Sequence, residues 1–126
     1  MHEKIRHTIF LDFIKNMPAQ IIDGKQIAAD LHGAIKQRVQ QRIDAGKKAP
    51  GLAVVLSGEE PASQVYVRNK RLACEKTGII STAYDLPAST TQQALNDLID
   101  KLNEDENIHG ILVQFPLPEN LDESAV

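Results

Sequence analysis

The spacing of apolar residues changes along the chain from one segment to the next. Short apolar runs rich in β-branched residues predict three strands, over residues 52–56, 79–86 and 110–115. Stretches in which apolar side chains recur every third or fourth residue predict three helices, one before the first strand and one in each connection. Helices that alternate with buried strands are typical of α/β proteins. The pattern therefore predicts a small three-layer α/β fold, a parallel sheet with crossover helices.

The first predicted helix has signals at both ends. Asp23 and Gln26 stand in the relation of N-cap and N3 in a capping box, and Gly46 is a typical C-terminal stop. An apolar residue occurs at every fourth position between them, at Ile27, Leu31, Ile35, Val39 and Ile43. This stripe drifts slowly around the helix and can lie on a sheet.

The second helix is predicted over residues 62–76, with Gly78 as its stop. Val65, Leu72 and Ala73 are expected to form its core face.

The third helix is predicted to begin at a capping box formed by Thr90 and Gln93. Its core face follows the helical repeat and comprises Leu95, Leu98, Ile99 and Leu102.

Residues 1–18 fall outside this pattern. They mix apolar residues with charges of both signs and lack the uninterrupted apolar stretch of a secretory signal. Two interpretations stay open: a short amphipathic helix, or a stretch upstream of the natural start, since Met17 begins an ordinary N-terminus. We expect the folded domain to comprise residues 19–126. No apolar run approaches the roughly 18 residues that a spanning helix needs, so no membrane partner is expected.

Composition and charge narrow the class of protein. The 126 residues carry 14 basic and 17 acidic side chains, and a formal net charge of -3 without a dense Lys/Arg block argues against nucleic acid as a partner. The single cysteine, Cys74, excludes an internal disulfide and favours a reducing, cytoplasmic setting. We expect it to be a small packing residue. The four histidines are scattered, so no metal site is expected.

Candidate chemistry is expected beyond the carboxyl ends of the strands, where open α/β sheets bind their ligands. Tyr66 and Lys70 are four residues apart and share one side of the second helix. Gln114 follows the apolar run of the third strand, which we expect to be central in the sheet. A lysine beside a neutral amide can serve as a base or proton shuttle, and an aromatic ring can lie against a heterocycle.

Ordinary explanations stay open for each of these residues. A tyrosine and a lysine at this spacing are commonly a solvated helix face. Gln114 is either a structural hydrogen-bonding group or a group that faces a ligand. Glu59 and Glu60, after the first strand, are more typical of a solvated loop than of a metal or phosphoryl site. No glycine-rich dinucleotide motif and no P-loop occurs in the sequence.

Several motifs match one known family. A Pro-Ala-Ser turn leads into Tyr-x-x-x-Lys within residues 61–70, and Val-Gln-x-Pro-Leu-Pro follows at residues 113–118. Together with residues 21–25 and 50–56, these segments resemble the N-terminal half of the bifunctional methylenetetrahydrofolate dehydrogenase/methenyltetrahydrofolate cyclohydrolase family. The resemblance runs from about Ala19 to the end of the sequence.

The resemblance implies the N-terminal half of a two-domain enzyme with two reactions in one cleft. The enzyme oxidises 5,10-methylenetetrahydrofolate to the methenyl form with NADP, and then hydrolyses that product to 10-formyltetrahydrofolate. Lys70 would be the catalytic lysine, Tyr66 would lie against the folate ring system, and Gln114 would contact both Lys70 and the substrate. Val113 and Phe115 would be further substrate-binding residues. The resemblance also implies a homodimer. It implies a role in one-carbon metabolism, which supplies purine, histidine and methionine biosynthesis.

The sequence also departs from the family pattern. It ends before the family's Asp-Val-Asp-Gly segment and before its Rossmann-like NADP domain. We therefore expect a folate-side half-site without a cofactor site, inactive alone as a dehydrogenase, with a truncated gene model or a partial sequence as the cause. One alternative assigns only folate binding or subunit assembly to the chain. A second is a stand-alone receiver-type signalling or binding module, although Gln114 stands at the strand end where a receiver needs an aspartate.

Overall fold

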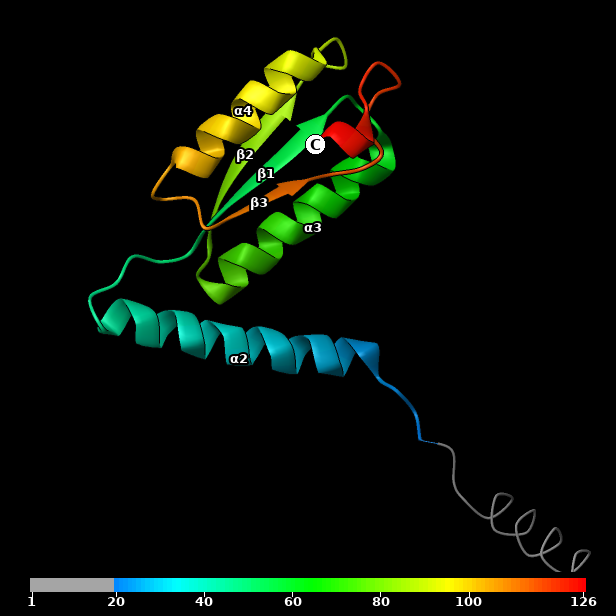
Figure 1. Cartoon of the computed structure of the whole chain (residues 1–126). Coiled ribbons are helices and arrows are strands. Elements are labelled where there is room, and N and C mark those ends of the chain that lie inside the picture. Colours follow the sequence, from blue (N-terminus) through cyan, green and yellow to red (C-terminus); the bar gives the residue numbers. More distant parts are fainter. Residues whose placement is uncertain (1–19) are drawn as a thin grey trace, which may run out of the picture.

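The computed structural model describes residues 20–126, which contain one parallel sheet (Figure 1). Its strands are ordered β2–β1–β3, with β1 (Gly51–Ser57) between β2 (Ile80–Leu86) and β3 (Gly110–Val113). The apolar runs predicted all three strands, and β1 is buried along nearly its whole length because it is paired on both sides. The two interpretations of residues 1–18 lie outside the described residues.

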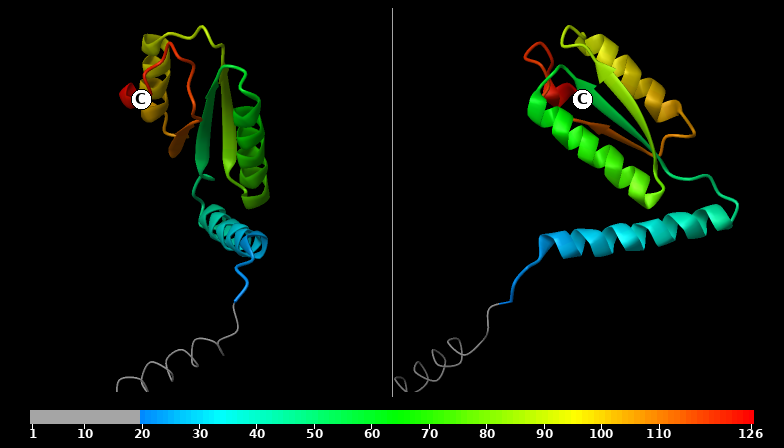
Figure 2. Two further views of the ribbon diagram at one scale, coloured as in Figure 1. Left: turned by 90° about the vertical axis from the view of Figure 1, so that its right-hand side faces the viewer. Right: turned by 180° about the vertical axis from the view of Figure 1, so that it is seen from behind.

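Helices cover both faces of the sheet (Figure 2). α3 (Pro61–Thr77) connects β1 to β2, and α4 (Gln92–Glu104) connects β2 back across the sheet to β3. The two crossovers run in opposite directions along the sheet, so the right-handed rule places their helices on opposite faces. α2 (Gly24–Asp44) lies beyond α3, and a short 3-10 helix, η1 (Glu123–Ala125), follows the turn after β3. The small three-layer α/β fold is therefore confirmed.

The core is divided between the two faces because successive residues of β1 point to opposite sides. The cluster on the α4 side comprises Ala53, Val55, Leu95, Leu102 and Leu121. The cluster on the α3 side comprises Val54, Leu56 and Val67. Each large aliphatic side chain that is fully buried contributes about 1.5–3 kcal/mol. The α4 side is the larger apolar core, and polar residues occupy part of the inner face of α3.

The apolar stripe of α2 could lie on a sheet, but in the structure it does not. Of the stripe only Val39 is buried, whereas Ile27 and Leu31 are exposed. α2 packs against α3, and Val39 lies close to Gly78, so the covered part of the stripe in residues 20–126 is Ile35 and Val39. The predicted cap is confirmed, because the Asp23 carboxylate accepts hydrogen bonds from two backbone amides of the first turn.

The predicted core face of α3 is wrong for its two largest residues. Val65 is 48% exposed and Leu72 is 44% exposed. The buried stripe consists of small or medium side chains, Ser63, Val67, Cys74 and Thr77. These residues follow the spacing of one helix face, and half-buried Lys70 occupies the same stripe. The helix is therefore rotated about its axis from the predicted orientation, and Lys70 points over the sheet toward the segment after β3.

Several element boundaries differ from the prediction, two of them for a clear physical reason. Thr91, not Thr90, caps α4 by accepting a hydrogen bond from the backbone N–H of Ala94. The Thr90 hydroxyl donates instead to the carbonyl of Pro87, so it closes the preceding turn. β3 ends at Val113 rather than at residue 115, because the prolines that follow cannot donate to a strand ladder.

Candidate active site

Lys70, Gln114 and Tyr66 meet at the carboxyl end of β3. The Lys70 Nζ atom donates a hydrogen bond to the Gln114 Oε1 atom at 2.7 Å. The same Nζ atom lies 5.5 Å from the centre of the Tyr66 ring. Tyr66 is 59% exposed, so one face of its ring is open to a ligand. The structure thus brings together an amine, a carboxamide and an aromatic ring from two segments that are far apart in sequence.

The fold fixes each of these side chains. Lys70 lies on the inner stripe of α3, one turn before buried Cys74, and therefore projects over the sheet. Gln114 continues the backbone ladder by one bond beyond β3, because its N–H donates to the carbonyl of Val55 at 2.9 Å. Leu112 packs on the α3 side of the sheet, so strand alternation also turns Gln114 toward α3 and Lys70.

The orientation of the Gln114 amide is set by a second hydrogen bond. Its Nε2 group donates to the carbonyl of Phe115 at 2.6 Å, so its Oε1 atom is left to face Lys70. The hydroxyl of Ser63, a residue that is almost completely buried, lies 3.5 Å from the same Phe115 carbonyl. Sequence reasoning missed Ser63. Its place on the stripe of Lys70 and Val67 is the signal that could have found it.

The expectation that β3 is central in the sheet is wrong. β1 is the central strand, and β3 is an edge strand of the sheet in residues 20–126. Val113 packs into the core on the α4 side, so the structure does not bring it to Lys70. Phe115 is exposed and contributes its backbone carbonyl to the group. The roles of Val113 and Phe115 in substrate binding stay predictions.

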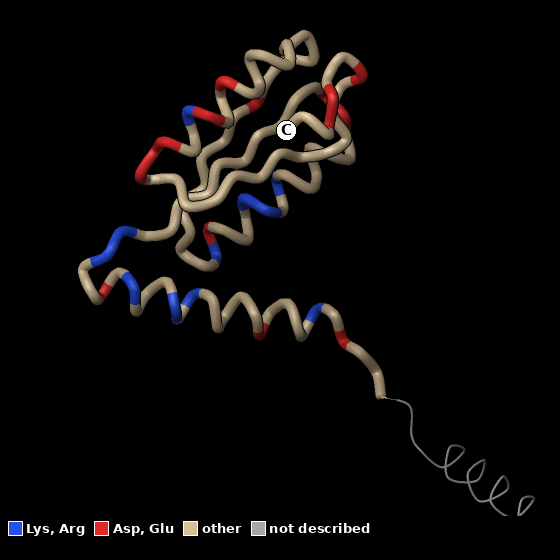
Figure 3. Tube along the Cα trace, in the orientation of Figure 1, with Lys and Arg blue, Asp and Glu red and all other residues tan. Residues whose placement is uncertain are grey.

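Lys70 has no acidic partner within the described part of the chain. The ion pair found among residues 20–126 joins its neighbour Arg71 to Asp85 on β2, with 2.8 Å between the Nη2 and Oδ1 atoms. Figure 3 shows Lys and Arg gathered on α3, whereas Asp and Glu predominate on α4 and the segment after β3. An amine held by a neutral amide is positioned without being neutralised by a countercharge.

Other candidate groups contribute less to the site. Cys74 is buried, as expected of a packing residue, and burial raises the pKa of its thiol. No group of three or more metal-binding side chains gathers within the part of the chain that the structure describes. Among the described helices, none combines the length and apolar character needed to cross a bilayer.

A parallel α/β domain with an amine, an amide and an exposed aromatic ring at its carboxyl edge has the architecture of a catalytic domain. The chain belongs to the tetrahydrofolate dehydrogenase/cyclohydrolase family, because the model of that family's catalytic domain matches residues 22–126. This membership excludes the receiver-type module.

Solved structures agree with the family match. The chain is 43% identical to the bifunctional methylenetetrahydrofolate dehydrogenase/cyclohydrolase of Campylobacter jejuni, with a TM-score of 0.78 over 81% of this chain and 36% of that one. It is 37% identical to a 5,10-methylenetetrahydrofolate dehydrogenase of the silkworm Bombyx mori, with a TM-score of 0.81 over 84% and 37% of the two chains.

A third solved relative carries a bound cofactor. The methylenetetrahydrofolate dehydrogenase-cyclohydrolase of Trypanosoma brucei, determined with NADP and an inhibitor, is 37% identical, with a TM-score of 0.79 over 86% of this chain and 38% of that one. The chain therefore spans between 36% and 38% of the length of these three relatives.

Proposed function

We propose that this chain supplies the folate-binding, catalytic half-site of an enzyme that converts 5,10-methylenetetrahydrofolate to the methenyl form and hydrolyses that product to 10-formyltetrahydrofolate. The observation that carries the proposal is the hydrogen bond of 2.7 Å between Lys70 Nζ and Gln114 Oε1, formed beside the exposed ring of Tyr66. Family membership supports the substrate class. Tyr66 offers a flat surface for the folate ring system, and Lys70 offers a proton carrier.

The hydrolytic step requires a proton carrier. The oxygen of a water molecule bonds to the methenyl carbon, and one carbon–nitrogen bond of the bridge breaks to leave the formyl group. Of the two protons that water brings, one reaches the departing nitrogen and one is released. Lys70 Nζ accepts a proton from the attacking water and returns one to the nitrogen, while Gln114 holds the amine in position.

NADP is the proposed oxidant of the first reaction, and residues 20–126 do not fit it. Dinucleotide-binding turns carry several glycines that let a pyrophosphate approach a helix N-terminus. The turn before α3 has a single glycine, Gly58, and presents Glu59 and Glu60 at the helix N-terminus. Two carboxylates there repel a pyrophosphate. We therefore assign NADP binding to the part of the enzyme that this chain does not span.

A titration tests the half-site directly. Isotope-labelled chain is titrated with 5-formyltetrahydrofolate, a stable reduced folate, and followed by NMR. We expect saturable shifts at the amides around Tyr66, Lys70 and Gln114. NADP serves as the comparison ligand and is expected to cause no saturable shift. A folded chain that shows no saturable shift with the folate, or shows it only far from α3, would contradict the proposed function.

A homodimer and a cytoplasmic setting are part of the same proposal. Family resemblance supports the homodimer, and the single, buried cysteine is compatible with a reducing compartment. Light scattering on the enzyme that contains this domain tests the first, and localisation of a tagged protein tests the second.

A further inference from the structure

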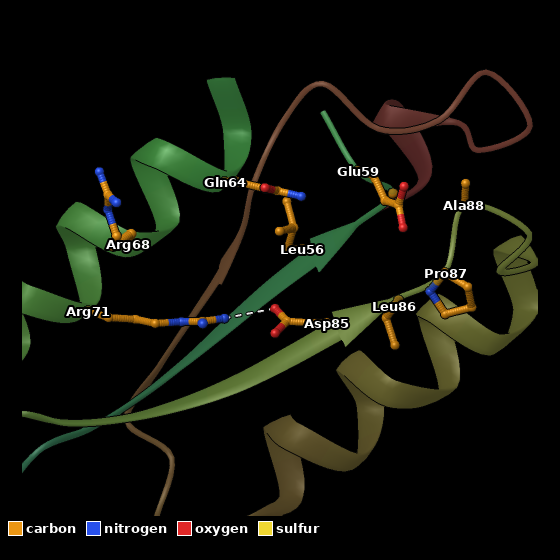
Figure 4. Close-up of a pocket in the computed structure, with 10 residues that line it drawn as sticks. Leu56, Glu59, Gln64, Arg68, Arg71, Asp85, Leu86, Pro87 and Ala88 are labelled. Carbon is orange, nitrogen blue, oxygen red and sulfur yellow. Dashed lines mark hydrogen bonds and ion pairs between the residues drawn. The ribbon is translucent and has the colours of Figure 1, made fainter. Parts of the chain in front are cut away.

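A second concave surface lies on the opposite flank of α3 from Lys70. Lys70 reaches the segment after β3, whereas the next residue, Arg71, reaches Asp85 on β2, and β1 separates these two strands. A groove of about 800 Å³ opens beside Arg71. It is lined by Leu56, Gly58, Glu59, Gln64, Arg68, Arg71, Asp85, Leu86, Pro87 and Ala88, and we call it the β2-side groove (Figure 4).

The fold builds this groove from three segments. Arg68 and Arg71 are three residues apart on α3, and in Figure 4 the Arg71 side chain extends toward Asp85 whereas the Arg68 side chain points away from it. The turn that leaves β2 contributes Pro87 and Ala88 on the other side. Gly58 turns the chain from β1 into α3 with a φ of 85°, a conformation that favours glycine, and its N–H bonds to the end of β2. The walls therefore belong to ordered elements.

Hydrogen-bond donors in the groove exceed the acceptors that satisfy them. Two guanidinium groups bring about ten N–H donors. Asp85 accepts one hydrogen bond from Arg71, at 2.8 Å. The Nε atom of Arg71 is buried and has no hydrogen-bond partner in residues 20–126, and Arg68 forms no hydrogen bond or ion pair with those residues. A ligand rich in acceptor oxygens would satisfy the guanidinium donors that face the groove.

The other residues that line the groove indicate which kind of ligand would fit it. Leu56, Leu86 and Pro87 provide an apolar floor beside the two cations. Glu59 is the second carboxylate of the groove, and it lies away from both guanidinium groups in Figure 4 and forms no ion pair with them. An arginine fork suits a carboxylate or a phosphate oxyanion, and an apolar floor suits a compact hydrocarbon or aromatic body.

We propose that the β2-side groove binds a small organic anion, a carboxylate or a phosphate ester, with its oxyanion on Arg71, its apolar body against Leu86 and Pro87, and the exposed Arg68 side chain turning toward the bound anion. The site is separate from the folate half-site, because the two lie on different flanks of α3. It does not depend on the proposed catalytic function.

Two aromatic anions test the proposal and distinguish its chemistries. The chain is titrated with benzoate and with phenyl phosphate, and NMR follows the backbone amides and the arginine Nε–H signals. We expect at least one of the anions to shift Arg68, Arg71 and Ala88 saturably at millimolar concentration, and the tighter ligand identifies the preferred oxyanion. Benzyl alcohol, which has a similar ring and no charge, is expected not to saturate.

Variants locate the binding determinant. Arg68→Ala is expected to weaken anion binding about tenfold, as the loss of charge-assisted hydrogen bonds does. Arg68 is exposed, so the variant keeps the fold. Lys76→Ala, which removes a cation from the last turn of the same helix, is the matched control and should leave the affinity unchanged. The proposal fails if neither anion saturates, if benzyl alcohol binds as tightly, or if Arg68→Ala binds like the unmodified chain.

Discussion

The two flanks of α3 hold similar cations by different partners. On the β3 side, Lys70 donates to the neutral amide oxygen of Gln114 at 2.7 Å. On the β2 side, Arg71 donates to the carboxylate of Asp85 at 2.8 Å. Adjacent residues on one helix thus have nearly equal hydrogen-bond distances, and they differ in the charge of the acceptor.

The charge of the acceptor indicates different roles for the two cations. A carboxylate stabilises its partner as a cation, so the Arg71–Asp85 pair is suited to holding α3 against β2. An amide accepts a hydrogen bond without supplying a countercharge, so Gln114 positions the Lys70 amine without a carboxylate beside it. Of the four predictions that follow, three alter one side of this comparison, and the last alters the buried stripe between the two sides.

The largest effect is expected from Lys70→Met in an enzyme that contains this domain. Methionine keeps a long side chain and removes the amine, so cyclohydrolase turnover should fall by about 10²–10⁴-fold, the usual value for a positioned acid–base group. Absorbance of the methenyl substrate measures the rate, and titration with 5-formyltetrahydrofolate measures binding, which should change far less. Lys76→Met is the control, from the last turn of α3. Unchanged hydrolysis in Lys70→Met would place the proton carrier elsewhere.

A smaller loss of turnover is expected from Gln114→Glu. This change gives Lys70 a carboxylate acceptor, as Arg71 already has in Asp85. The carboxylate would hold Lys70 as an ammonium, so turnover should fall by roughly 10²-fold. Urea unfolding should show little change, because a partly exposed ion pair contributes about 0–1 kcal/mol. Gln37→Glu makes the same chemical change at an exposed site on α2. Full turnover in Gln114→Glu would show that the neutrality of the amide is unimportant.

The strands and the three members of the site could be predicted from the sequence. Short runs rich in β-branched residues between turn signals indicate strands, and Gln114 follows such a run directly. Tyr66 and Lys70 share a helix side by spacing alone. These features depend on local pattern, which a single sequence contains.

The rotation of α3 could not be predicted in the same way. Hydrophobicity favours Val65 and Leu72 as the inner face, whereas the structure buries the smaller Ser63 and Cys74. The contact of Ser63 with the Phe115 carbonyl and the pair of Arg71 with Asp85 both depend on that rotation. The exposed stripe of α2 is a similar case. The apolar repeat shows which face of the helix is hydrophobic, but it does not show which element covers that face.

A modest effect is expected from Asp85→Asn, which neutralises the β2 side. Asparagine can still accept the hydrogen bond from Arg71, and the side chains of Arg71 and Asp85 are 32% and 61% exposed. The free energy of unfolding should therefore fall by at most about 1 kcal/mol. Urea unfolding measures it, with Asp100→Asn on the exposed side of α4 as the control. A loss of several kcal/mol would mean that the ion pair does more than tether α3.

The smallest effect concerns Cys74, which lies on the inner stripe between the two flanks. Burial raises the pKa of its thiol, and a weaker contact with the Ser81 hydroxyl opposes the shift. A pKa that is raised on folding favours the protonated thiol, so this contribution to stability is complete below the thiol's ordinary pKa, about 8.5, and is lost as the pH rises through the raised value. Cys74→Ala has no such group. Its urea midpoint should therefore decrease less steeply with pH above about 8.5 than that of the unmodified chain. If the urea midpoints of Cys74→Ala and the unmodified chain depended on pH in the same way, the thiol would stay protonated or ionise without a cost in stability.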